Sequence, residues 1–197
     1  MPPWRRPSAW LLVAIFALMA STYYGLTNWL ADSFVERGWS EDRAGWLIAV
    51  LNMGAVPGAL LIPWLSDHVG GRRPWLIGTG VVYLLGAFGF VELPGAAWLW
   101  SVCVGVTSAG MFSLVLTLPL DIEHDPRRVG ALVGMMLGLG YAIGAVSPFV
   151  LGVVRDATGS FTGSLWLIVG FSAALLAAVA AAPTGRRGRA ASARPTT

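Results

Sequence analysis

A hydroxyl, a phenol and an amide follow one another at helical spacing within the first thirty residues. Ser21, Tyr24 and Asn28 are three and four residues apart, so in a helix they fall on one face. Together these groups could bind a small polar solute through hydrogen bonds. Alternatively, the tyrosine belongs to an interfacial aromatic belt, as we expect for Trp29, and the amide bonds a neighbouring helix. Polar groups in an apolar segment are costly and usually face a bundle interior, which favours a cavity-lining role for Tyr24 and Asn28.

Four further polar side chains in apolar segments are weaker candidates for the same solute path. They are Asn52, Thr107, Ser108 and Tyr141. Both histidines, His68 and His124, fall in short polar loops, so the sequence offers no intramembrane Ser and His pair and no cluster with metal-ligand spacing. The single cysteine, Cys103, allows no disulfide, and we expect it to pack. We therefore expect no catalytic residues, no metal and no cofactor.

Ionisable residues gather at the ends of the apolar segments. Asp121, Glu123, His124 and Asp125 precede an arginine pair at 127–128, and we interpret them as a solvated charge cluster. No acid, arginine or histidine lies in the middle of an apolar segment, which argues against a complete proton relay.

The elements that must position these groups are membrane helices. Apolar residues make up 56% of the 197 positions and charged residues 12%, which excludes an ordinary soluble domain. Six apolar runs are long enough to cross a bilayer at about 1.5 Å per residue. They cover residues 10–31, 44–65, 75–91, 96–120, 129–154 and 164–182. We predict an all-α membrane protein of six transmembrane helices, because backbone groups in lipid must be satisfied internally and no alternating barrel pattern is present.

Arginine placement predicts the orientation of these helices. With the N-terminus inside, ten arginines fall in inner segments and three, Arg37, Arg43 and Arg155, in outer ones. Cationic residues in short loops stay in the cytoplasm. We therefore expect a multi-pass protein of the cell (plasma) membrane with both termini in the cytoplasm. The net charge of +3 is therefore a topology signal, and we expect no nucleic-acid partner.

The first three and last three helices carry a faint repeat. Pro57, then Asp67 and Gly70, then Trp-Leu-Ile at 75–77 recur as proline at 148, Asp-x-x-Gly at 156–159 and Trp-Leu-Ile at 166–168. Since three helices form each unit, the units run oppositely through the bilayer, an inverted 3+3 repeat. Glycines at four-residue spacing predict that the second and fifth helices pack centrally, while the apolar third and sixth suit the lipid-facing rim.

The domain boundaries follow from the same pattern. We read residues 1–182 as one transmembrane domain without a cleaved signal peptide, because the first apolar run is long and contains tyrosines and an asparagine. Residues 183–197, rich in Arg, Ala and Pro, have no apolar face, and we expect a disordered cytoplasmic tail.

The loop between the second and third helices carries the most specific motif. Residues 63–73 read PWLSDHVGGRR, which resembles the G-x-x-x-D-R-x-G-R-R loop of the major facilitator superfamily. Asp67, Gly70, Arg72 and Arg73 match, whereas Pro63, His68 and Gly71 depart from the pattern. The resemblance implies a cytoplasmic latch whose charged groups exchange partners during transport. The alternative is a simple topology anchor.

Two more segments extend the resemblance from about residue 10 to residue 182. The fifth run, with Gly140, Gly144, Pro148 and Gly152, is similar to the Gly-rich eleventh helix of these transporters, where such residues allow either bending or close static packing. The first helix and the Gly-Trp-Ser at 38–40 resemble the cyanate and nitroimidazole permease branch.

The resemblance implies the C-terminal half of a transporter that moves a small anion or small organic molecule by alternating access. Members of the family have twelve helices, with the solute held between two six-helix halves. We therefore expect the lipid bilayer, a small-molecule solute, and either a second copy of this chain or a separate N-terminal half as partners. A membrane enzyme and a water channel lack the residues that they need. A non-transporting membrane fragment or assembly partner stays the alternative.

Overall fold

The computed structural model describes residues 3–182, and these fold almost entirely into helices. The predicted tail at 183–197 lies outside the described residues. The helices are α1 (Pro7–Glu36), α2 (Glu41–Val69), α3 (Arg72–Glu92), α4 (Ala97–Ile122), α5 (Pro126–Gly144), α6 (Ser147–Thr158) and α7 (Phe161–Ala181), with short 3-10 turns η1 (Pro3–Arg5) and η2 (Pro94–Ala96). The described part of the chain contains six helical segments long and apolar enough to cross a membrane, which confirms the all-α class and the number of spans.

The helices extend beyond the apolar runs because polar side chains and glycines define their ends. Ser40, Asp125 and Ser160 each accept a backbone N–H in the first turn of α2, α5 and α7. Between α2 and α3, Gly70 and Gly71 have φ of 82° and 83°, a region that side chains with a Cβ rarely adopt. The motif loop is therefore a two-glycine turn that reverses the chain within very few residues.

The fifth span is not the continuous helix that the sequence predicts for 129–154. It breaks into α5 and α6 at Ala145 and Val146. Pro148 has no N–H to donate, and the Val146 N–H turns instead to the carbonyl of Ile143. Pro57, its counterpart in the repeat, lies inside an unbroken α2. Proline alone therefore does not determine where this fold interrupts a span.

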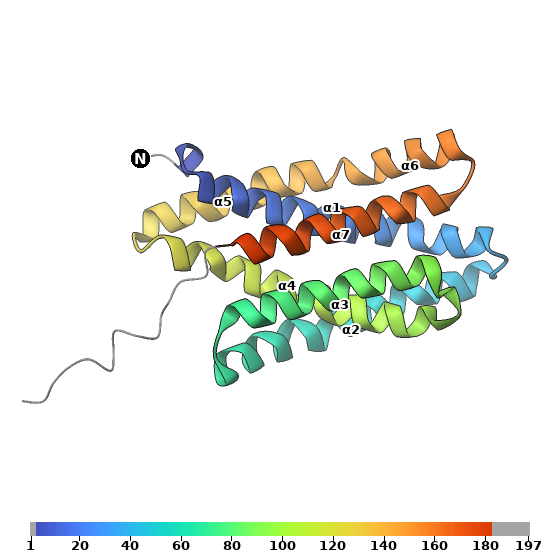
Figure 1. Ribbon diagram of the computed structural model, residues 1–197, viewed down its shortest axis with the longest axis horizontal. Helices are drawn as coiled ribbons and strands as arrows, with labels where there is room; N and C mark the ends of the chain where they lie inside the picture. Colours follow the sequence, from blue (N-terminus) through green and yellow to red (C-terminus); the bar gives the residue numbers. More distant parts are fainter. Residues whose placement is uncertain (1–2, 183–197) are drawn as a thin grey trace, which may run out of the picture.

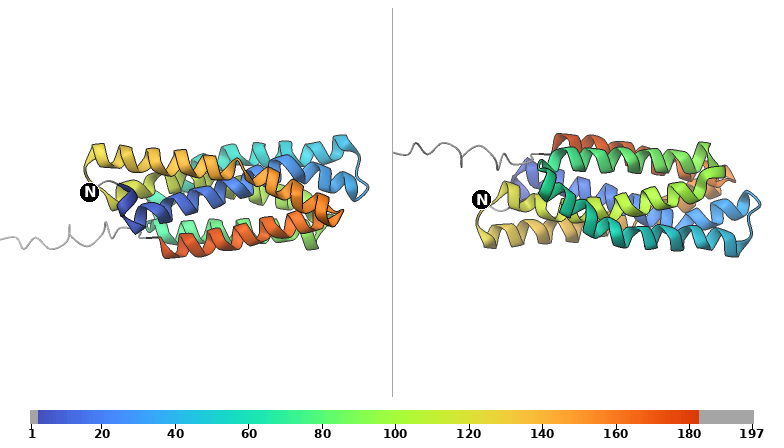
Figure 2. Two further views of the ribbon diagram at one scale, coloured as in Figure 1. Left: turned by 90° about the horizontal axis from the view of Figure 1, so that it is seen from above. Right: turned by 90° about the horizontal axis from the view of Figure 1, so that it is seen from below.

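The helices run side by side along one axis, and the two described ends of the chain lie at the same end of the bundle (Figure 1). The first triplet of spans is α1, α2 and α3, and the second is α4, the α5–α6 span and α7. α3 and α7 pack against each other, α7 also contacts α1, and α3 also contacts α4 (Figure 2). In the most apolar stretches, 67% of α1 and 56% of α4 residues are buried, against 22% for α2 and 22% for the α5–α6 span. The prediction that the second and fifth helices pack centrally is wrong. α1 and α4 are central, because each is covered by helices of both triplets.

Glycines bring α2 against α4 without making α2 central. A Cβ on Gly58 would meet the backbone of Val106, and a Cβ on Gly105 would meet the carbonyl of Leu51. The two backbones therefore touch along one line, while the rest of α2 exposes apolar side chains such as Met53. Close approach of small residues stabilises one helix pair and does not require burial on all sides.

Candidate functional site

A cavity of about 210 Å³ opens between α1, α2, α4 and α5. Its lining comes mostly from α1 and α4, with one residue each from α2 and α5. The lining residues are Phe16, Met19, Ala20, Tyr23, Tyr24, Ala55, Ser108, Ala109, Phe112 and Tyr141. None of them carries a charge at neutral pH, so the cavity offers aromatic faces and hydroxyl groups to a solute.

The aromatic side chains of the cavity contact one another. The Phe16 and Tyr141 rings meet edge to face, with centroids 4.8 Å apart and planes at 87°. Tyr24 and Tyr141 are 6.4 Å apart with planes inclined by 36°, and Phe16 lies 5.9 Å from Phe112. These separations are typical of favourable aromatic pairs, which hold the wall of the cavity in place.

Three of the predicted path residues, Tyr24, Ser108 and Tyr141, line this cavity. The Ser108 hydroxyl donates to the Gly105 carbonyl within its own helix. Within residues 3–182, neither the phenol of Tyr24 nor that of Tyr141 has a hydrogen-bond partner. Both phenols are therefore available to a bound solute.

The two predicted asparagines lie beside the cavity without lining it. The exposed amide of Asn28 donates to the Tyr24 carbonyl at 2.8 Å. Asn52 donates to the Ile48 carbonyl and accepts from the Tyr23 hydroxyl at 2.9 Å. This last bond fixes one wall residue of the cavity from α2.

Ser21 and Thr107 lie elsewhere. Ser21 borders a more open apolar hollow formed with α5, α6 and α7, and its carbonyl accepts from the Ser147 hydroxyl. Thr107 is buried and donates to the Cys103 carbonyl of its own helix. The common polar face expected for Ser21, Tyr24 and Asn28 therefore does not form in the cavity, and Tyr24 alone of the three reaches it.

The apolar part of the lining, chiefly Phe16, Met19 and Phe112, is absent from the residues predicted from the sequence. Polar side chains stand out in an apolar segment, whereas these three do not. A signal was present, since Phe16, Ala20 and Tyr24 are each four residues apart and share a helical face.

At the end of the bundle where the chain starts, the motif loop is tied to other helices. Arg72 pairs with Asp121 at the end of α4 at 2.7 Å, and Arg73 donates to the Ala180 carbonyl near the end of α7. Asp67 is exposed and has no ion pair within residues 3–182. The two motif arginines therefore bind groups on α4 and α7 of this bundle, whereas the motif acid is exposed.

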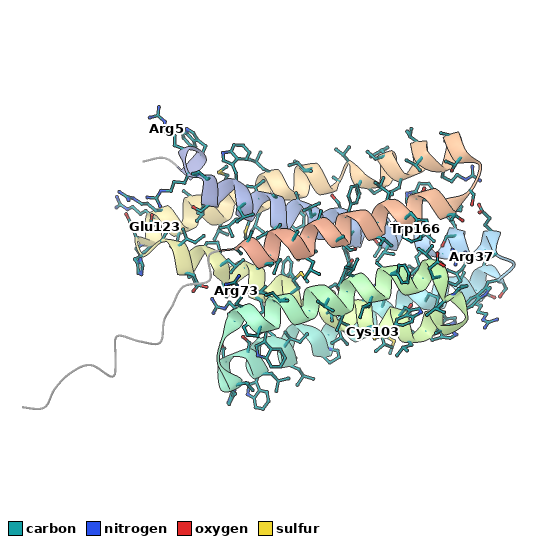
Figure 3. All side chains as sticks on the ribbon, in the orientation of Figure 1. Arg5, Arg37, Arg73, Cys103, Glu123 and Trp166 are labelled. Carbon is teal, nitrogen blue, oxygen red and sulfur yellow. The ribbon has the colours of Figure 1, made fainter. Side chains whose placement is uncertain are left out.

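The predicted charge cluster is solvated only in part, because Asp125 is exposed whereas the side chains of Asp121 and Glu123 are largely covered. Glu123 pairs with Arg6 at 2.7 Å, and its side chain is only 13% exposed; Arg128 reaches Glu123 at 4.0 Å and Asp125 at 3.5 Å. The N–H of His124 and the guanidinium of Arg6 hold the pKa of the Glu123 carboxyl below its ordinary value. Arg5, Arg73 and Glu123 lie at this end, and Arg37 lies at the other (Figure 3). The cluster thus joins the starts of α1, α3 and α5 to the end of α4.

At the opposite end of the bundle, two side chains at the end of α1 form hydrogen bonds with groups of α3 and α7. Arg37 donates to the Phe90 carbonyl at the end of α3, and burial lowers the pKa of its guanidinium. Glu36 accepts from the Ser160 hydroxyl and the Phe161 N–H at the start of α7. These contacts satisfy helix-end groups that would otherwise lack partners.

The small residues of the fifth span pack tightly on α1. A Cβ on Gly140 would meet the Phe16 ring, one on Gly144 would meet Ala20, and one on Gly152 would meet Trp29. The Trp29 indole also donates to the Pro148 carbonyl at 2.9 Å. Close packing therefore holds on both sides of the break. Bending there during transport stays a prediction.

Comparison with known proteins agrees with this architecture. A family model described as Major Facilitator Superfamily matches residues 2–145. The chain is 36% identical over 156 residues to the cyanate transport protein CynX of Escherichia coli and 29% identical over 159 residues to the 2-nitroimidazole transporter of the same organism. These matches cover 79% and 81% of the chain but 40% of each relative. A gentisate transporter of Corynebacterium glutamicum is 27% identical over 175 residues, or 88% of the chain and 38% of that protein. The chain thus spans about two fifths of the length of the curated relatives that it matches.

Proposed function

The chain belongs to the major facilitator superfamily, and from this premise we propose that it forms the C-terminal six-helix half of a small-solute transporter that works by alternating access. It is a multi-pass membrane protein similar to the cyanate and nitroimidazole permeases. The observation that carries the proposal is the cavity, which the central helices α1 and α4 line together with α2 and α5. An uncharged pocket of this kind among membrane helices suits a small solute.

The pairing of the helices supports an inverted repeat. α1 of the first triplet packs against α5 and α7 of the second, while α4 packs against α2 and α3. Exchanging the two triplets therefore leaves the set of principal helix pairs unchanged. Gly70 and Gly159, which correspond in the sequence repeat, both have positive φ at the end of the second element of their triplet. Such a two-fold relation is common in secondary transporters and places the solute where the repeats meet.

A companion six-helix bundle completes the site in this proposal. The exposed apolar side chains of α2 and α5 include Met53, Val56, Leu60, Leu139 and Ile143, and these helices flank the cavity. The relatives are long enough to contain about two such bundles. The companion is either a separate N-terminal half or a second copy of this chain, since a two-fold axis along the membrane normal would keep two copies in one orientation.

Rocking of the two bundles would expose the cavity to each side in turn. The pairs Arg72–Asp121 and Arg6–Glu123 lie within this bundle, so we expect them to persist while it moves as a unit. The exposed Asp67 and His68 are then the latch groups that meet the companion. In this arrangement the chain spans the cell membrane with both termini on the cytoplasmic side, as the arginine distribution predicts.

The incomplete cavity also supports the alternative function, a non-transporting membrane fragment or assembly partner that needs a separate N-terminal half. The α2 and α5 helices beside the cavity leave apolar side chains exposed, so in this proposal the chain alone would bind solute at half a site. Uptake measurements distinguish the two.

The test is solute uptake into proteoliposomes that carry this chain alone or together with a candidate N-terminal half. Radiolabelled cyanate and 2-nitroimidazole are suitable solutes. We expect saturable uptake by the complete assembly and its loss in Ala55→Trp, which fills the cavity, but not in Leu85→Trp on the exposed side of α3. Uptake by the chain alone would identify a second copy as the companion. No uptake with any candidate companion would refute transport and favour the assembly partner.

A further inference from the structure

The cavity wall differs from an anion site because it offers no cation. The charged groups of the described chain lie at the two ends of the bundle, and none lines the cavity. Taking an anion out of water without a compensating charge or several hydrogen-bond donors is costly. The chemistry of this half therefore does not favour the charged part of any solute.

What the wall does offer is aromatic surface. Rings of Phe16, Tyr24, Phe112 and Tyr141 line the cavity, and Tyr23 is held at its edge by the bond to Asn52. The Phe16 and Tyr141 rings are nearly perpendicular and in contact, with centroids 4.8 Å apart, so they form a continuous aromatic surface on one side of the cavity. A planar ring can meet such a wall in both favourable geometries, edge to face or offset stacking.

The part of the site that this chain lines has room for a single ring. An apolar cavity of about 150 Å³ in a protein interior is enough to bind benzene. The cavity here is about 210 Å³, which leaves room for one ring with one or two small substituents. The phenols of Tyr24 and Tyr141 border this space and can donate a hydrogen bond to a polar substituent or a ring nitrogen.

We propose that this half of the transporter recognises its solute as a planar, single-ring aromatic or heteroaromatic molecule, through the wall of Phe16, Tyr24, Phe112 and Tyr141. Any anionic group on the solute is then met by the companion bundle. This inference rests on the proposed function, which supplies the companion, but binding of the ring belongs to this chain. An aromatic wall can also bind a quaternary ammonium, which is the competing outcome of the test.

The experiment measures binding to the purified full chain in lipid nanodiscs by saturation-transfer difference NMR. The probes are 2-nitroimidazole as an uncharged ring, cyanate as an anion without a ring, and tetramethylammonium as a cation without a ring, with cyanate followed by its ¹⁵N signal in a parallel titration. We expect the chain to bind 2-nitroimidazole, with cyanate and tetramethylammonium at least tenfold weaker. Equal or tighter binding of either ring-free probe, or no binding of 2-nitroimidazole at millimolar concentration, would overturn the proposal.

Substitutions locate the binding. Tyr141→Leu and Phe112→Leu each remove one ring of the wall and should weaken 2-nitroimidazole about three- to tenfold, the usual range for one aromatic contact. Tyr141→Phe, which keeps the ring, should retain most of the affinity. Phe88→Leu is the matched control, because Phe88 packs with Trp166 on α3 and α7 away from the cavity. If Phe88→Leu weakens binding as much as Tyr141→Leu, the wall is not the ring site.

The result is separable from the proposed function. If 2-nitroimidazole binds but no assembly shows uptake, the proposed transport function is refuted and the ring-binding site is supported. If cyanate alone is taken up and no ring binds, transport is supported and the ring-binding site is refuted.

Discussion

Replacing Gly58 by alanine should destabilise the bundle, although alanine is the better helix former. An alanine Cβ at this position would lie 2.7 Å from the Cα and carbonyl carbon of Val106 and closer still to its carbonyl oxygen. An ordinary contact is about 3.5 Å or more, so the α2 and α4 backbones would have to separate by roughly 1 Å. Overpacking of this kind costs about 1–3 kcal/mol, and the separation also weakens the neighbouring Gly105–Leu51 contact.

The opposing term is helix propensity, which favours alanine over glycine by about 1 kcal/mol. Gly78→Ala in α3 is the matched control that isolates this term, because a Cβ there would meet nothing within 4 Å. We expect Gly78→Ala to be neutral or slightly stabilising. The clash at position 58 is with backbone atoms, which cannot rotate away, so we expect a cost in the upper part of that range, about 2–3 kcal/mol. The net loss is then about 1–2 kcal/mol, which lowers the unfolding temperature by about 2–8 °C at about 2–4 °C per kcal/mol for a chain of this size.

The assay uses the chain's own thiol. Cys103 is half-buried on α4, so a maleimide dye that fluoresces on reaction reports the loss of helix packing as detergent-solubilised protein is heated. Gly105→Ala, on the other side of the same contact, should behave like Gly58→Ala. If Gly58→Ala unfolds at the same temperature as Gly78→Ala, the close approach of α2 and α4 does not exist.

Three further predictions concern the end of the bundle that holds the motif loop. A double-mutant cycle of Arg72→Gln and Asp121→Asn, followed by thermal unfolding, should give a coupling of about 0.5–1 kcal/mol for this partly exposed pair, and no coupling would mean that the ion pair is absent. Gly70→Ala should cost about 1–3 kcal/mol because its φ of 82° and ψ of 152° suit only glycine, and an unfolding temperature equal to that of the parent would contradict this turn. Because the folded pKa of Glu123 is lowered, its contribution to stability is full above the ordinary pKa of a glutamate and is lost as the pH falls through the lowered value. Tryptophan-monitored unfolding should therefore show a smaller stability difference between the parent and Glu123→Gln at pH 3 than at pH 7, whereas a constant difference would refute the shift.

The six spans could be predicted from the sequence because charges interrupt the apolar runs and nothing else in a bilayer satisfies the backbone. The ends of the helices were harder to predict from the sequence. α1 continues from residue 31 to Glu36, since a helix does not stop where hydropathy falls. The break before Pro148 and the unbroken α2 around Pro57 show that a proline in the sequence does not by itself predict where a span breaks.

The candidate site was predicted only in part. Tyr24, Ser108 and Tyr141 could be predicted because polar atoms stand out in an apolar segment. Phe16 and Phe112 could not, because their residue type is the same as that of residues that face lipid. The central position of α4 and the open faces of α2 and α5 depend on which helices pair across the repeat. That pairing is a property of tertiary packing, and glycine spacing in one helix cannot reveal it.

The central claim, that the cavity between α1, α2, α4 and α5 is the transport path, is tested most directly by access to its wall from both sides of the membrane. In a Cys103→Ser background, Ala55→Cys places a thiol on the cavity wall and Leu85→Cys places one on the exposed side of α3. In the assembly with the companion bundle, we expect a membrane-impermeant thiol reagent to modify position 55 from either side, with transported solute slowing the reaction, and to leave position 85 unmodified. Reaction at position 55 from one side only, or no faster than at position 85, would contradict alternating access through this cavity.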